Sequence, residues 1–104
     1  PKDSRHYGCV YFLRNFTQYN KKFDWDQGNI LLKNFSEYLT NEFPNAILFR
    51  VYGDDFVLIS KERFDAECAK PSLLDDTGVS SECYMLNVTD DFMTEVKRLE
   101  FQNI

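Results

Sequence analysis

The sequence is poor in the residues that build metal and disulfide sites. It contains one histidine, His6, and three cysteines, which are Cys9, Cys68 and Cys83. The odd number and wide spacing of the cysteines match no zinc or disulfide pattern, and a lone histidine has no ligand or base partner in the sequence. We therefore interpret the cysteines as reduced thiols of a cytoplasmic protein and expect no cofactor at these residues.

Basic charge and long apolar runs are also lacking. The chain has 12 Lys and Arg against 17 Asp and Glu, which gives a formal net charge of -5. Phosphate backbones are bound by clustered Lys and Arg, so this balance argues against a nucleic-acid partner. No apolar stretch approaches the roughly 18 residues of a membrane-spanning helix, and the polar N-terminus shows no signal peptide. We expect cytoplasmic localisation and no membrane contact by this segment.

Hydrophobic and aromatic residues, by contrast, are plentiful enough for a core. They make up 43% and 16% of the 104 residues, respectively. A chain of this length fits one domain over residues 1–104. Because the sequence starts at Pro1 without a methionine, we expect this domain to be a fragment of a longer multidomain protein.

Hydrophobic periodicity predicts four strands and at least two long helices. An aromatic and β-branched run predicts a buried strand over Tyr7–Leu13, and a stripe of apolar residues predicts a helix over Trp25–Glu42. Asp24 and Gln27 before that helix form a capping-box pattern. The other predicted elements are strands at Ala46–Tyr52, Phe56–Ser60 and Ser81–Val88, a short helix at Glu62–Ala69, a loop at Leu73–Gly78, and a last helix with Phe92, Val96 and Leu99 on one side.

This order predicts an α+β fold of the two-layer sandwich type. A β-α-β-β-α-β core is typical of ferredoxin-like and palm domains, with a central antiparallel sheet. We expect the Tyr52–Phe56 hairpin in the middle of that sheet and the Trp25–Glu42 helix packed on one face. Fold alone does not indicate function, because such cores serve many functions.

The most informative segment is the acidic hairpin. It contains Gly53, Asp54 and Asp55 between Arg50-Val51-Tyr52 and Phe56. Two acidic residues after a glycine can hold a divalent cation against a triphosphate, since glycine lets phosphate approach the backbone. Surface hairpins also carry such residues for turn geometry alone.

A second segment makes the pattern more specific. Phe16-Thr17-Gln18-Tyr19-Asn20, followed by Gly28-Asn29-Ile30-Leu31-Leu32, is similar to the family pattern "Phe-Lys-x-Ile-Asn-Asp … Gly-His-x-x-Gly-Asp-x-Leu-Leu". The hairpin is similar to "Arg-Tyr-Gly-Gly-Asp-Glu-Phe". The region from Gly8 to Ser60, about half of the chain, therefore resembles a GGDEF domain, the fold of bacterial diguanylate cyclases.

The resemblance implies that the guanine site is weakened. The family's guanine-binding Asn corresponds to Asn20, and its guanine-binding Asp corresponds to Asn29. Hydrogen bonds to charged groups contribute roughly 1.5–3 kcal/mol, against about 1 kcal/mol for neutral ones, so loss of the carboxylate should lower the affinity for GTP. Gly53 is the third residue expected to lie beside a bound nucleotide.

The resemblance also implies that the metal site is lost. The family's metal-binding aspartate corresponds to Phe12, and a nearby acidic position corresponds to Arg14. Asp54 remains as a metal ligand, but one carboxylate cannot hold two magnesium ions against a triphosphate. The first glycine of the signature corresponds to Tyr52, and the phosphate-binding lysine corresponds to Thr17. The family's inhibitory Arg-x-x-Asp site would fall on Phe43 to Ala46, which read Phe-Pro-Asn-Ala.

The resemblance thus implies a degenerate, non-catalytic GGDEF domain that acts as a regulatory or interaction module in bacterial cyclic di-GMP signalling. Its partners would be an EAL phosphodiesterase or sensor domain of the same protein and, weakly, GTP, with magnesium only if nucleotide still binds. Three alternatives stay open: a diguanylate cyclase with residual activity, a polymerase-like palm, and an unrelated ferredoxin-like interaction module. A palm would require a further acidic residue where Phe12 stands, and a basic nucleic-acid channel.

Overall fold

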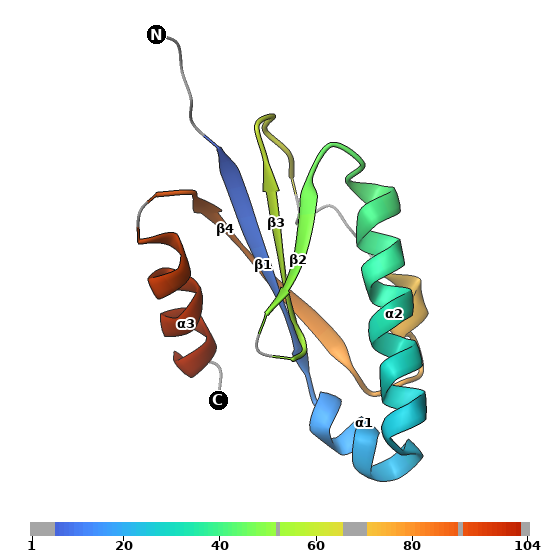
Figure 1. The fold of residues 1–104 in the computed structure, drawn as a ribbon. Coiled ribbons are helices and arrows are strands. Elements are labelled where there is room, and N and C mark those ends of the chain that lie inside the picture. Colours follow the sequence, from blue (N-terminus) through green and yellow to red (C-terminus); the bar gives the residue numbers. More distant parts are fainter. Residues whose placement is uncertain (1–5, 52, 66–70, 90, 103–104) are drawn as a thin grey trace, which may run out of the picture.

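The computed structural model describes residues 6–51, 53–65, 71–89 and 91–102, and shows a four-stranded sheet with helices packed against it (Figure 1). Its elements, in chain order, are β1 (Tyr7–Arg14), α1 (Phe16–Phe23), α2 (Trp25–Glu42), β2 (Ile47–Val51), β3 (Asp55–Ser60), the short 3₁₀ helix η2 (Ser72–Leu74), β4 (Ser80–Asn87) and α3 (Phe92–Gln102).

The sheet is antiparallel throughout, as predicted, with the strand order β2-β3-β1-β4. The predicted buried strand is β1, which lies between β3 and β4. The prediction that the hairpin occupies the middle of the sheet is wrong, because β2 lies at an edge. An unbroken apolar run is suited to a central strand that is covered on both faces, and β1 has that run.

The helix predicted over Trp25–Glu42 is confirmed as α2. Its buried residues Leu31, Leu32, Phe35 and Leu39 pack on one face of the sheet against a cluster that includes Cys9, Tyr11, Phe56 and Leu58. Only half of the predicted capping box forms. The Gln27 backbone N–H donates to the Asp24 carboxylate at 2.9 Å, whereas the Asp24 N–H donates to the Asn20 carbonyl and closes α1.

Helix α1 was not predicted. Its apolar residues Phe16, Tyr19 and Phe23 recur at intervals of three and four residues, which is a helical pattern. The helix is only eight residues long, so this pattern is a weak signal in the sequence. The rings of Phe16 and Tyr19 are stacked, with centroids 6.2 Å apart, and the ring of Phe23 lies 4.8 Å from that of Tyr19, tilted by 44°. The helix begins after Asn15, whose φ of 67° turns the chain out of β1.

The opposite face of the sheet carries α3, so the predicted two-layer sandwich is not what forms. Phe92 and Val96 of α3 are buried against Val10, Phe12 and Val57, which point away from α2. In Figure 1, α3 and α2 lie on opposite sides of the strands. The physical reason is that successive β1 side chains point to opposite faces, and both sets are apolar, so each face requires a cover.

The link between β3 and β4 also differs from the prediction. Residues 62–65 of the predicted Glu62–Ala69 helix are not helical, and residues 66–69 lie outside the described part of the chain. Phe64 instead packs its ring 5.3 Å from the ring of Phe43, which holds this segment against the end of α2. The predicted Leu73–Gly78 loop begins within η2, where Leu74 is buried in the core. The result is a small α+β domain with three α-helices in the residues described.

Candidate functional site

The residues singled out by sequence gather at one end of the sheet. The C-terminal end of β1, the tip of the β2–β3 hairpin and the start of α1 all lie there (Figure 1). Tyr11 pairs with Phe56, and the two strands are antiparallel. The next residues, Phe12 on β1 and Asp55 on β3, therefore lie beside each other on the face covered by α3.

Phe12 contributes packing at this end and no ligand atom. Its side chain is buried, and its ring lies 5.8 Å from the ring of Tyr84, tilted by 58°. Glu82 is directly opposite Phe12 on β4. A phenyl ring in this position presents only carbon to the space beside Asp55.

Glu82, the acidic residue opposite Phe12 on β4, forms an ion pair with Arg14. The Arg14 guanidinium donates to the Glu82 carboxylate at 2.8 Å, and the Tyr84 hydroxyl donates to the same oxygen at 3.3 Å. The hydrogen bond from Arg14 lowers the pKa of Glu82 below its ordinary range and raises the pKa of Arg14. Glu82 was not singled out from the sequence, because only the strand pairing places it next to Arg14.

The hairpin has the geometry that its sequence predicted, apart from Tyr52, which lies outside the described residues. Gly53 has a φ of 89°, a conformation that favours glycine, and a Cβ there would meet nothing within 4 Å. Asp54 is half-buried in the turn, and Asp55 is buried at the start of β3. The Arg50 side chain donates to the Gly53 carbonyl and braces the turn.

This arrangement does not fit the magnesium site of the GGDEF family. Within residues 6–51, 53–65, 71–89 and 91–102, no three His, Cys, Asp or Glu side chains lie close enough to hold a metal ion. Divalent magnesium takes oxygen ligands, and Phe12 has none to offer. Arg14 brings a positive charge to the place where the family pattern has a second acidic residue. Its partner Glu82 already accepts hydrogen bonds from two donors.

The residues expected at the guanine site are only partly available. The Asn20 side-chain oxygen is buried and accepts no hydrogen bond from the described residues, and it lies 1.8 Å from where a Cβ on Gly28 would stand. The absence of a side chain at Gly28 thus leaves the space that the Asn20 amide occupies in this rotamer. Asn29 follows Gly28 and is exposed on α2, as Thr17 is on α1. Asn20 would have to rotate before its oxygen could accept from a ligand.

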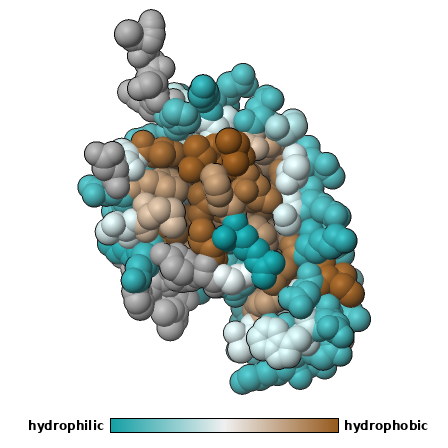
Figure 2. Space-filling view, viewed as in Figure 1, coloured by the Kyte–Doolittle hydropathy of each residue, from teal (hydrophilic) through white to brown (hydrophobic). Residues whose placement is uncertain are grey.

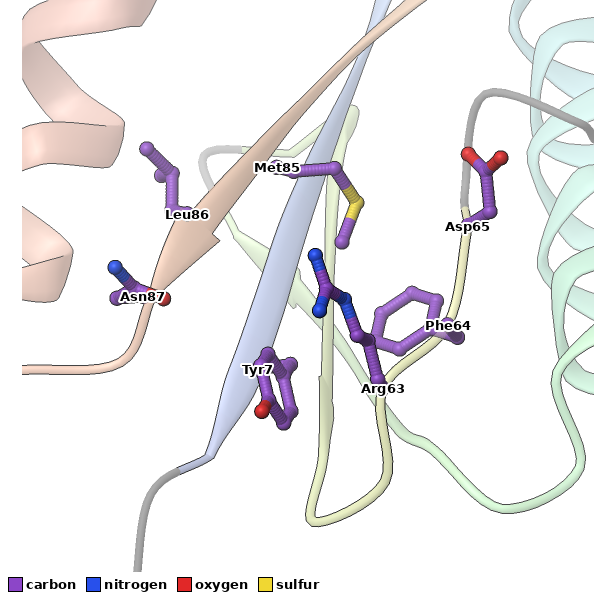
Figure 3. A pocket seen from close by; sticks show the side chains of 7 residues that line it. All are labelled: Tyr7, Arg63, Phe64, Asp65, Met85, Leu86 and Asn87. Atoms are coloured by element: carbon purple, nitrogen blue, oxygen red, sulfur yellow. The ribbon is translucent and has the colours of Figure 1, made fainter.

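A pocket of about 700 Å³ lies at the other end of the sheet, where Tyr7 pairs with Ser60. Figure 3 shows the Arg63 side chain reaching toward Met85, with Phe64 beside it and Tyr7 on β1. The hairpin tip is at the opposite end of β3. Sequence patterns gave no sign of this pocket, because the residues that line it come from three separate segments.

The two cysteines in the described part of the chain, Cys9 and Cys83, are free thiols. Cys9 is fully buried, and burial raises the pKa of its thiol to about 12, so the unreactive protonated form prevails at neutral pH. Cys83 is half-buried and Cys68 lies outside the described residues. No helix in the described part of the chain is both long and apolar enough to cross a membrane.

Comparison with family models, with curated proteins and with solved structures finds no match for this chain.

Proposed function

We propose that this domain is a catalytically inactive GGDEF-like module that regulates, or docks on, a neighbouring domain in a cytoplasmic cyclic di-GMP signalling protein. The observation that carries the proposal is the replacement of the metal site. Phe12 fills the position beside Asp55, and the Arg14–Glu82 ion pair occupies the adjoining strands. Phosphoryl chemistry on a triphosphate requires metal or cationic groups that face the phosphate, and the buried phenyl ring of Phe12 supplies neither.

The succession of elements supports the same proposal. The segment with the resemblance consists of β1, the α1–α2 pair and the β2–β3 hairpin. In the order β2-β3-β1-β4, β1 lies between β3 and β4, which is consistent with a ferredoxin-like core. Two features differ from the simple β-α-β-β-α-β order: the described residues between β3 and β4 hold the 3₁₀ helix η2 and no α-helix, and α3 follows β4 and covers the opposite face.

The inactivity is tested by incubating the purified chain with GTP and magnesium and separating the products by chromatography. We expect no cyclic di-GMP under conditions in which an active diguanylate cyclase converts its substrate. Product that disappears in an Asp54→Ala variant would contradict the proposal, because it would show that the hairpin supports metal-dependent turnover.

Nucleotide binding is the second part of the proposal and is expected to be weak. The buried Asn20 oxygen is unavailable without rearrangement, and Asn29 lacks the charge of a carboxylate. Binding stabilises the folded state only as ligand exceeds its dissociation constant, so millimolar GTP should raise the melting temperature by no more than about one or two degrees.

Calorimetry with GTP and ATP separates a sensor from a purely structural module. Heat with GTP and not with ATP, reduced in Asn20→Ala and unchanged in a control such as Thr40→Ala, supports a GTP sensor. Thr40 is a suitable control because it lies near the far end of α2, where its hydroxyl donates to the Ser36 carbonyl. No heat with either nucleotide removes the sensor role and leaves a module that acts through a protein neighbour, such as an EAL phosphodiesterase or a sensor domain.

A further inference from the structure

The outer edge of β2 combines two features that favour association. As the terminal strand in the order β2-β3-β1-β4, it pairs on one side only. Alternate backbone N–H and C=O groups along its other side therefore point outward, where they can pair with another strand. Two of the three exposed side chains of β2 are also apolar: Ile47 is 62% exposed and Phe49 is 47% exposed, and the third is Arg50.

These side chains belong to an apolar patch that α3 leaves uncovered. Ile47 and Phe49 pair with Ile59 and Val57 of β3, so all four point to the same face of the sheet. Val57 is buried in the cluster under α3, whereas Ile59 is only partly buried. Figure 2 shows hydrophobic residues gathered on the surface between the two flanking helices.

Strand β2 lacks two of the residue types that often protect a sheet edge. Its sequence, Ile-Leu-Phe-Arg-Val, has no proline and no lysine. Its one charged residue, Arg50, points to the face opposite Phe49 and donates to the Gly53 carbonyl. The other edge strand, β4, begins with the polar residues Ser80, Ser81 and Glu82, and its Glu82 is held by Arg14.

We propose that β2 pairs with β2 of a second copy of this chain, antiparallel and about a two-fold axis at Phe49. In this register Ile47 lies opposite Val51 of the partner, and Phe49 lies opposite its own counterpart. On the other face Leu48 lies opposite Arg50, so no two like charges are placed across from each other. The strand is thus complementary to itself, which is what a two-fold symmetric interface requires. This inference is independent of the proposed function.

The dimer should be weak and reversible. Five residue pairs bury much less than the roughly 1,200–2,000 Å² of a standard interface. We expect a dissociation constant between about 10 µM and 1 mM, which corresponds to the low end of specific association. Sedimentation equilibrium of residues 1–104 measures it directly, and a sample that stays monomeric up to millimolar concentration overturns the proposal.

Charge at Phe49 tests the register. Phe49→Asp places two carboxylates opposite each other and should weaken the dimer at least about tenfold. The matched control is Ile30→Asp, which changes a side chain that is 50% exposed on α2 and should leave the dissociation constant unchanged. Equal weakening by both variants would point to nonspecific hydrophobic association and would contradict the pairing.

A mixture of two variants gives the sharpest result. Phe49→Asp and Phe49→Lys should each be monomeric alone and should form a heterodimer when mixed, because this is the one antiparallel register that brings position 49 opposite itself. Circular dichroism checks that each variant is folded, and Phe49→Thr, which preserves the preference for strand, should also weaken the dimer without adding charge. A mixture that remains monomeric overturns the two-fold register.

Discussion

At the residue scale, the end of β1 belongs to the core at a place where the sequence suggested a candidate site. Phe12 is buried beside the ring of Tyr84, and Arg14 pairs with Glu82 on the neighbouring strand β4. The phenyl ring and the ion pair both join β1 to β4 at this end. These contacts therefore stabilise the sheet at positions where metal chemistry would require exposed oxygen atoms.

The Arg14–Glu82 pair should make stability depend on acid pH. The pKa of Glu82 is lower in the folded protein than its ordinary value of 4.5, so the folded state favours the carboxylate. This contribution is fully present above about pH 4.5 and is lost as the pH falls through the folded pKa. Glu82→Gln should lower the melting temperature at pH 7, and the difference from the unmodified chain should shrink toward pH 3. Thermal unfolding by circular dichroism at the two pH values measures this.

The exposed Glu95–Arg98 pair provides the control for that experiment. It joins residues three apart on α3 at 2.7 Å, and it does not connect separate elements. Glu95→Gln should therefore change the melting temperature less than Glu82→Gln at pH 7, since exposed pairs within one helix contribute little. A larger effect at Glu95 would contradict the importance assigned to the cross-strand pair.

At the element scale, the junction of α1 and α2 depends on one residue that serves both helices. The Asp24 N–H closes α1, and its carboxylate caps α2. Its backbone has a φ of 107°, which residues other than glycine rarely adopt, so the conformation that forms the cap is strained.

Two substitutions at Asp24 separate capping from strain. Asp24→Ala loses the cap and retains the strained conformation, so the free energy of unfolding should fall by about 1 kcal/mol. Asp24→Gly loses the same side chain but relieves the strain, so it should be more stable than Asp24→Ala by about 1 kcal/mol or more. Urea denaturation followed by circular dichroism gives both values. Equal stabilities for the two variants would show that the backbone at this position is not strained.

At the scale of the whole molecule, α3 closes the second face of the sheet over β1 and leaves the β2 side open. Val96 is fully buried against the sheet, whereas Met93 on the same helix is 45% exposed. One half of this face is therefore covered by α3, and the other half, over β2, is exposed. The edge proposed to form the dimer thus lies next to the core.

The packing of α3 is tested by a pair of variants on that helix. Val96→Ala removes two buried methyl groups and should lower the free energy of unfolding by about 1–3 kcal/mol, because it leaves a cavity against the sheet. Met93→Ala should stay within about 0.5 kcal/mol of the original chain. Urea unfolding compares the two. Similar small losses for both would mean that α3 does not cover the sheet in solution.

The sequence determined the elements in which local pattern and burial agree. The helix Trp25–Glu42 was predicted at its observed bounds, because its apolar residues recur at helical spacing and Asp24 marks its start. The strands around Gly53 and the strand that begins at Tyr7 were also predicted, since alternation and the turn residues are local signals. The candidate positions Asn20, Asp54 and Phe12 came from sequence as well, through the spacing of two motifs.

Tertiary structure alone decided which surfaces those elements share. Nothing in the local sequence indicates that α3 covers the face opposite α2. The apolar stripe of an amphipathic helix shows which side of the helix is buried, but not which face of the sheet the helix covers. The same holds for Glu82, whose contact with Arg14 depends on strand pairing across 68 residues. Edge position is likewise a property of the sheet: the sequence predicts a strand at Ala46–Tyr52 but not its place in the sheet, and the edge position of β2 accompanies the exposure of Ile47 and Phe49.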